Sequence, residues 1–170
     1  RALTVRGIIR HFRRAYDEAT SDFRRAFELN PNFALNIFFM AWHESLVGRL
    51  DEAKEHAQLA LRLSPRDADA WVGNAYLALA QAYFAESNFV DAQYWGERAI
   101  QMTPRAPIRR ALMIAASAHL GRPHESRPHA DALATFAPTF LDSIMSGRLA
   151  LYRLPEHNSL LVEGIAKSRL

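Results

Sequence analysis

Three histidines have the spacing in this chain that comes nearest to a chemical site. His119, His124 and His129 follow one another at intervals of five residues, beside a predicted turn. Imidazole nitrogens bind zinc and nickel, so three of them brought together could hold such an ion. However, the chain has no cysteine to supply a thiolate ligand, and histidines are common on protein surfaces. We therefore predict a polar surface here and no metal site.

The other patterns that would carry chemistry are incomplete. His43 is followed by Glu44, but no second histidine stands at the spacing that zinc proteases use. The chain has no glycine-rich phosphate-binding loop, and no serine, histidine and aspartate are spaced as a catalytic set. We predict that the chain is not an enzyme and needs no cofactor.

Basic residues gather near the start of the chain, at Arg10, Arg13, Arg14, Arg24 and Arg25. Such a cluster could contact nucleic acid, but no aromatic platform or recognition-helix pattern accompanies it. The formal net charge is only +3, from 21 basic and 18 acidic residues, and the middle of the chain is acidic. This pattern favours a solvated or partner-facing surface over nucleic-acid binding, with end-to-middle self-association as an alternative.

Composition indicates a folded chain with a continuous core. Hydrophobic residues make up 49% of the 170, and no apolar run approaches the roughly 20 residues that span a bilayer. The N-terminus lacks a secretory signal pattern. We predict a soluble, cytoplasmic protein without a membrane segment. Because the numbering opens at Arg1, inside a predicted helix, we expect the sequence to be a fragment of something longer.

Prolines divide most of the chain at regular intervals. Pro31, Pro65, Pro104 and Pro138 are separated by 34, 39 and 34 residues, and each follows an amphipathic helical pattern. Small residues recur five and twelve places before most of these prolines, which would let two helices approach closely. The pattern predicts four helical hairpins, at about 1–33, 34–67, 68–106 and 107–138. The helices expected within them are 3–12, 16–29, 34–47, 51–63, 67–83, 89–102, 107–120 and a last one near 130–136.

These positions resemble the tetratricopeptide repeat, a 34-residue helical hairpin. The matching residues in the first three units are Tyr16, Ala19, Phe23, Ala26 and Pro31; Gly48, Ala53, Ala60 and Pro65; and Tyr76, Leu79, Ala80, Tyr83, Ala92, Ala99 and Pro104. The five extra residues of the third unit must lie between Pro65 and Tyr76, extending its first helix backwards through Trp71. The fourth unit departs from the pattern, because Pro128 should delay or kink its second helix. The resemblance implies an all-α superhelix of stacked hairpins.

Residues 139–170 lie outside the repeats. We expect two further helices there, at 140–151 and 159–165, that cap the fourth hairpin. The alternative is that the last helix lies in the groove of its own or a neighbouring molecule. Three segments are similar to C-terminal repeat regions of bacterial proteins that carry an adenylate-cyclase-type or winged-helix domain upstream. They are the segment LSPRDADAW, residues 115–122 and the final segment VEGIAKSRL.

In such a superhelix the first helices line the concave face, where partners bind. The residues expected to form the binding groove are Phe38, Trp42, Asn74, Leu77, Gln81, Phe84, Ile108 and His119. This lining is apolar and aromatic, so it favours a hydrophobic peptide, a helix or another copy of the protein over a free carboxylate. We predict a non-catalytic protein-interaction scaffold. The alternative is an oligomerisation or regulatory module of an attached cyclase or transcription regulator.

Overall fold

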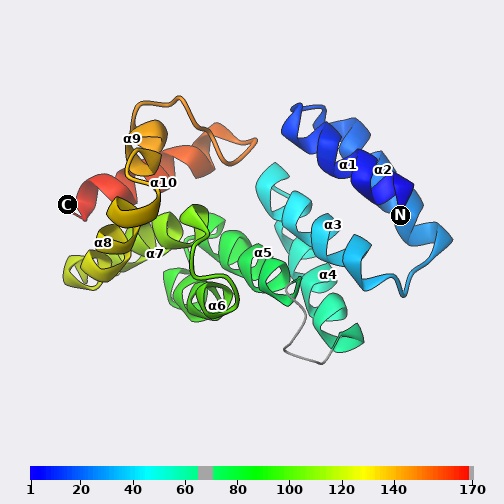
Figure 1. The fold of residues 1–170 in the computed structure, drawn as a ribbon, viewed down its shortest axis with the longest axis horizontal. Helices are drawn as coiled ribbons and strands as arrows, with labels where there is room; N and C mark the ends of the chain where they lie inside the picture. The colour runs from blue at the N-terminus through cyan, green and yellow to red at the C-terminus, as the bar shows by residue number, and fades with distance from the viewer. Residues whose placement is uncertain (65–70, 169–170) are drawn as a thin grey trace.

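The computed structural model describes residues 1–64 and 71–168, and the regular structure within them is helical throughout. Four consecutive helical hairpins form a curved row (Figure 1). They are α1 (Ala2–Phe12) with α2 (Tyr16–Leu29), α3 (Ala34–Val47) with α4 (Leu50–Leu63), α5 (Val72–Ala85) with α6 (Phe89–Met102), and α7 (Pro107–His119) with α8 (Arg127–Phe136). This arrangement confirms the predicted all-α superhelix.

Each hairpin turns through a residue in the left-handed backbone conformation. Arg14, Gly48, Ser87 and Gly121 have φ angles of 61°, 90°, 62° and 73°. They are separated by the same 34, 39 and 34 residues as the prolines. Glycine adopts this conformation without strain, whereas an arginine or serine is held there by the surrounding structure. The backbone conformation of the turns therefore repeats at the same intervals as the side-chain pattern.

Small residues set the distance between neighbouring hairpins. Ala19, Ala26, Ala53, Ala60, Ala92 and Ala99 are all buried. The second helix of each of the first three hairpins packs on the first helix of the next, so α2 contacts α3, α4 contacts α5 and α6 contacts α7. One hairpin cannot bury its apolar side alone, and the stack supplies the missing cover. The core therefore runs along the row between the hairpins.

Two of the expected helices differ in detail from those observed. Pro123–Ser126 forms a short 3-10 turn, and α8 begins only at Arg127, so Pro128 lies in its first turn where no hydrogen bond is lost. This confirms the predicted late start. In the third hairpin α5 begins at Val72, with Trp71 as its N-cap. The predicted extension across 67–70 and the helix stop at Pro65 lie outside the described residues.

The C-terminal part contains α9 (Phe140–Met145) and α10 (Pro155–Lys167). The prediction of one helix over 140–151 is wrong, because Gly147 takes a φ of 72° and ends the helical path two residues after Met145. Residues 149–154, which we call the strap, are not helical. In Figure 1 the segment between α9 and α10 reaches towards the N-terminal hairpins before α10 turns back. None of the helices described is long and apolar enough to span a membrane.

Candidate functional site

The first helices α3, α5 and α7, which the repeat pattern predicts to line the concave side, contact one another in order along the row, and we call the side that they form the inner face. Four of the predicted groove residues nevertheless have buried side chains, so they do not line an open surface: Phe38, Leu77, Gln81 and Phe84. Phe38 packs among residues of α3, α4 and α5. Phe84 belongs to a second cluster that includes Tyr152 from the strap. Residues of neighbouring helices and of the strap therefore cover side chains that we predicted to face a partner.

Asn74 and His119 are half-buried and have partners within the chain. The Asn74 side-chain oxygen accepts a hydrogen bond from the Arg109 guanidinium at 3.4 Å. His119 stacks on Phe89 with ring centroids 4.4 Å apart, and its Nε2 donates to the carbonyl of Leu160 at 2.9 Å. Both residues therefore serve contacts between helices in this structure.

The strap lies across the inner face of the second and third hairpins. The Arg153 amide donates to the carbonyl of Leu46 at 2.7 Å, which satisfies a last-turn carbonyl of α3. The Tyr152 hydroxyl donates to the carbonyl of Gln81, on α5, at 3.3 Å. Tyr152 is 3% exposed, and burial raises the pKa of its phenol, so the hydroxyl stays protonated and able to donate.

The strap also reaches the first hairpin. The Arg153 guanidinium forms an ion pair with Asp17, with atoms 2.7 Å apart, and lies over the ring of Tyr16 at 5.5 Å from its centroid. This pair lowers the pKa of Asp17 through the hydrogen bond from Arg153. Residues at the two ends of the chain thus meet across the inner face, which joins the first hairpin to the C-terminal part.

Asn158 holds the strap to the start of α10. Its side-chain oxygen accepts from the amides of Leu151 and Tyr152 at 2.9 and 3.0 Å. Its side-chain nitrogen donates to the carbonyls of Tyr152 and Leu154 at 2.7 and 3.2 Å. Four bonds from one side chain satisfy the polar backbone of a segment that has no helix or sheet. The strap and α10 therefore form one local unit.

The helix α10 packs along α7, the first helix of the fourth hairpin. Gly164 lies so close to Ala115 that an added Cβ would be 2.8 Å from the Ala115 Cα. Ala115 lies one helical turn before His119, a predicted groove residue, on the same face of α7. The C-terminal part therefore covers the fourth hairpin on its inner side, which combines the predicted cap with the alternative of a helix in its own groove.

An apolar pocket with a volume of about 400 Å³ opens on this face. We call it the aromatic pocket. Its residues come from the first hairpin, the inner face and the C-terminal part: His11, Phe12, Arg14, Tyr16, Trp42, Leu46, Pro107, Ile108, Phe140, Leu149, Ala150 and Leu151. It contains two predicted groove residues, Trp42 and Ile108. Phe12 and Tyr16 were not among the predicted groove residues, and no pattern in the sequence indicated that the strap would form a wall of the pocket.

A buried histidine pair supports the inner wall of the aromatic pocket. The Nδ1 atoms of His11 and His43 are 2.8 Å apart, and His43 Nε2 lies 2.8 Å from the Thr20 hydroxyl. The Thr20 hydroxyl donates to the carbonyl of Tyr16, so it accepts from His43 Nε2. His43 Nδ1 is then an acceptor, and His11 Nδ1 must donate to it. Every bond is made while both rings are neutral.

Burial lowers the pKa of both histidines, to about 4 for His11 and about 3 for His43. The charge of His11 and that of Arg153 lower the pKa of His43 further. The two rings thus stay neutral at physiological pH. His11 also packs against Trp42, with ring centroids 4.3 Å apart, so the pair fixes the position of a pocket residue.

The remaining residues singled out in the sequence, the spaced histidines and the N-terminal arginines, form no site together in the part of the chain that the structure describes. His129 pairs with Glu97, with atoms 3.1 Å apart, while His124 is exposed. Within 1–64 and 71–168 no three histidine or acidic side chains gather in a way that could hold a metal ion. Arg10, Arg24 and Arg25 of the basic cluster pair with acidic side chains.

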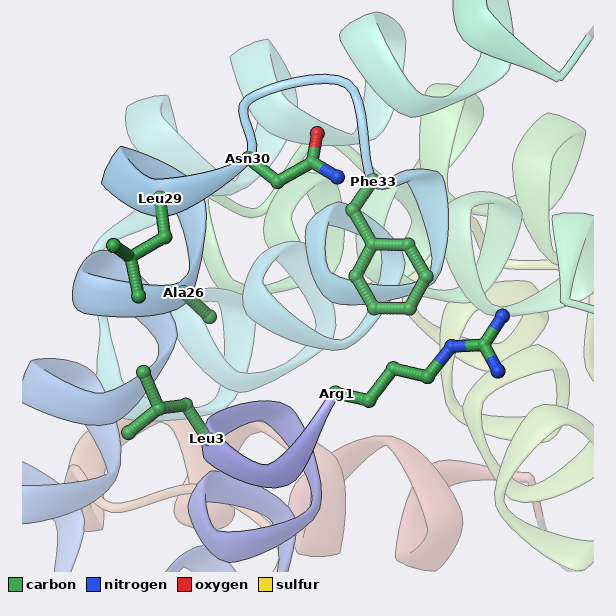
Figure 2. A pocket seen from close by; sticks show the side chains of 6 residues that line it. All are labelled: Arg1, Leu3, Ala26, Leu29, Asn30 and Phe33. Atoms are coloured by element: carbon green, nitrogen blue, oxygen red, sulfur yellow. The ribbon is translucent and has the colours of Figure 1, made fainter.

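A smaller pocket of about 260 Å³ lies at the start of the first hairpin. Figure 2 shows Leu3, Leu29, Phe33 and the aliphatic stem of Arg1 around it. The Arg1 guanidinium carbon lies 5.8 Å from the centre of the Phe33 ring. This pocket has an apolar wall but few groups that could orient a ligand, so the aromatic pocket is the stronger candidate site.

Comparison with known proteins identifies the fold. No protein-family model matches the chain, and no curated protein matches its sequence. Among solved structures, MamA has a TM-score of 0.64 at 15% identity, over 96% of this chain and 92% of that one. TTC0263, a thermophilic tetratricopeptide-repeat protein of Thermus thermophilus, has a TM-score of 0.64 at 17% identity, over 99% and 91%. YrrB, a tetratricopeptide-repeat protein with an unusual peptide-binding site, has a TM-score of 0.59 at 17% identity, over 95% of this chain and 80% of that one. With this likeness, the repeated left-handed turns and the buried small residues, the chain folds as a tetratricopeptide-repeat superhelix.

Proposed function

We propose that this chain is a non-catalytic scaffold that binds an apolar segment of a partner protein in the aromatic pocket. The observation that carries the proposal is the open pocket of about 400 Å³ on the inner face, with Phe12, Tyr16, Trp42 and Ile108 in its wall. The proposal includes a cytoplasmic location, as predicted from the sequence.

The chemistry of the pocket favours an apolar side chain over a free carboxylate. Aromatic side chains dominate the energetics of protein interfaces, because they bury a large area at a small entropic cost. Apart from the neutral His11, the basic group in the lining is Arg14, and a carboxylate would need several donors held together. That YrrB, a protein of the same fold, has a peptide-binding site supports a peptide as the ligand.

The test is a selection of peptides from a random display library on the full chain, followed by affinity measurements on variants. Trp42→Ala and Ile108→Asp are expected to weaken the selected peptides at least tenfold, because each removes an apolar wall. The matched control is Tyr94→Ala, an exposed aromatic residue on α6 that lies outside this pocket. Peptides that bind the Trp42 and Ile108 variants as well as the parent would refute the proposal.

A second candidate function is that of an oligomerisation or regulatory module of an attached domain, the cyclase or transcription regulator of the sequence analysis. It is favoured by an exposed apolar stripe on α1, where Val5 and Ile9 are 54% and 46% exposed and Phe12, 73% exposed, continues the stripe into the wall of the aromatic pocket. Large exposed apolar side chains on one helix often mark an interface. Sedimentation of the chain over a range of concentrations tests this candidate. A dimer that Ile9→Asp dissociates supports it, and a monomer at every concentration counts against it.

A further inference from the structure

We propose that the strap is a built-in ligand of the inner face, and that the partner segments which compete with it carry an aromatic, a basic and an apolar residue in succession. This inference rests on the proposed function in one respect, that the inner face binds a peptide, and it adds the kind of peptide and a second place for it beside the aromatic pocket. The strap residues that define the pattern are Tyr152, Arg153 and Leu154.

Each of these three residues occupies a distinct place on the repeats. Tyr152 is buried in the cluster that contains Phe84, and its hydroxyl donates to the carbonyl of Gln81. Both Phe84 and Gln81 belong to the inner-face set that the repeat pattern assigns to a ligand. An aromatic side chain with a polar tip therefore suits this place, since the ring fills it and the hydroxyl finds an acceptor.

The second place takes a cation. The Asp17 carboxylate and the ring of Tyr16 both face the Arg153 guanidinium, which combines an ion pair with a cation–π contact. The amide of the same residue donates to the carbonyl of Leu46, so the main chain of the ligand is held as well. A basic side chain is thus recognised together with its backbone.

The third place is apolar and tight. Leu154 lies against Gly48, where an added Cβ would be 2.5 Å from the Leu154 Cδ1. Gly48 is also the left-handed residue of the turn between α3 and α4. The turn of the second hairpin is therefore shaped to receive an apolar side chain beside it.

The attachment of the strap to the first two hairpins is suited to exchange. Its contacts include one main-chain hydrogen bond, the Leu154 contact, the cation–π contact with Tyr16, and an ion pair in which the Asp17 side chain is 82% exposed. Exposed ion pairs contribute little to stability. At the other end of the segment, Gly147 has a φ of 72° and nothing near its Cβ position, so the chain has room to pivot there. A peptide with an aromatic, a basic and an apolar residue in succession would make the same contacts in place of Tyr152, Arg153 and Leu154.

The test uses a fluorescein-labelled peptide with the sequence of residues 149–158, LALYRLPEHN, and a second probe in which aspartate replaces its arginine. Anisotropy measures the affinity of both probes for the full chain and its variants. In the double variant Asp17→Arg with Arg153→Asp the strap keeps its ion pair, while the arginine probe meets a like charge. We expect this variant to prefer the aspartate probe, and the parent to prefer the arginine probe, by about fivefold in each case.

A second variant opens the site without touching it. Gly164→Ala brings a Cβ against the backbone of Ala115 and displaces α10, although alanine itself favours a helix. We expect it to bind the arginine probe at least tenfold more tightly than the parent does. The controls are Asp131→Arg, on the exposed side of α8, and Glu163→Ala, exposed on α10, and both should behave as the parent. Circular dichroism melts confirm that each variant is folded.

The outcomes separate this inference from the proposed function. Equal affinity of the charge-swapped chain for both probes would overturn the inference. It would also be overturned if Gly164→Ala left the affinity for the arginine probe unchanged, or if neither probe bound any of the chains. If the library-selected peptides depend on Trp42 while the probes ignore the Asp17 swap, the aromatic pocket binds peptides but the strap is no ligand mimic. A switched probe preference with no effect of Trp42→Ala would support the strap site and refute the pocket.

Discussion

Lowering the pH from 7 to 5 is expected to weaken the fold through two buried histidines. His11 and His43 have pKa values of about 4 and about 3, both below the ordinary value of 6.5, chiefly because they are buried. When the pH falls below 6.5 the unfolded chain takes up a proton on each ring, and the folded chain does not. Stability is therefore at its full value above pH 6.5 and decreases as the pH falls from there towards the folded values.

The size of the effect follows from the number of pH units between 6.5, the pKa in the unfolded chain, and the pH of the measurement. One pH unit corresponds to about 1.4 kcal/mol for each histidine, so about 1.5 units and two rings give about 4 kcal/mol at pH 5. His56 acts in the opposite direction. Burial opposes its charge, but the hydrogen bond to Glu44 raises its pKa overall, so its contribution is present below pH 6.5 and is lost as the pH rises through the raised value. Burial lowers the pKa of His157, which acts in the same direction as the pair and opposes His56, so the net loss should stay at about 4 kcal/mol.

Urea unfolding at pH 7, 6 and 5 measures this loss. The double variant His11→Gln with His43→Gln keeps side-chain amides near Thr20 and Trp42 but removes both titrations, so its stability should change much less with pH. Replacing His124, an exposed histidine, by glutamine should leave the profile of the parent unchanged. If the double variant loses as much stability between pH 7 and 5 as the parent does, the assignment of acid sensitivity to this pair is refuted.

Two further predictions concern residues that the structure places in the interior. Phe84→Ala should lower the free energy of unfolding by about 3–5 kcal/mol, as expected for a core phenylalanine, whereas Phe12→Ala, with a side chain that is 73% exposed, should cost below about 0.5 kcal/mol. Equal costs in urea unfolding would place Phe84 back in an open groove. Asp22→Asn should cost about 1–3 kcal/mol at pH 7, because the buried carboxylate accepts from Arg6 and Arg10, while Glu28→Gln on the surface should cost close to nothing. The hydrogen bond from Arg6 lowers the pKa of Asp22, so this contribution is present above about pH 3.8 and is lost as the pH falls through the lowered value. An Asp22→Asn penalty that stays the same at pH 3 as at pH 7 would contradict it.

Much of the repeat architecture could be predicted because its signals are local. Proline ends a helix through its own ring, and apolar residues three and four positions apart define one face of a helix. The predicted ranges 16–29, 34–47 and 89–102 agree with the observed helices. Periodicity also placed Trp42 and Ile108 on the inner face, where the aromatic pocket now contains both.

The site itself could be predicted only in part. Phe38 and Phe84 are buried although they occupy the same kind of position in the repeat as Trp42, which lines the pocket. No local pattern in the sequence distinguishes a residue that the curvature of the row buries from one that it leaves exposed. The His11–His43 contact joins residues that are 32 positions apart on different hairpins, so neither histidine showed any sign of a partner in the sequence.

By itself the sequence determined that the chain is a row of helical hairpins, where most of the helices end and which helices face inwards. Those properties depend on residues within a few turns of one another. Only the tertiary structure decided that residues 149–154 leave the helical path and cross the inner face, and that Arg153 meets Asp17, 136 positions away. The curvature of the stack sets which surfaces come within reach of the strap, and that curvature is the sum of many small packing angles that no single segment encodes.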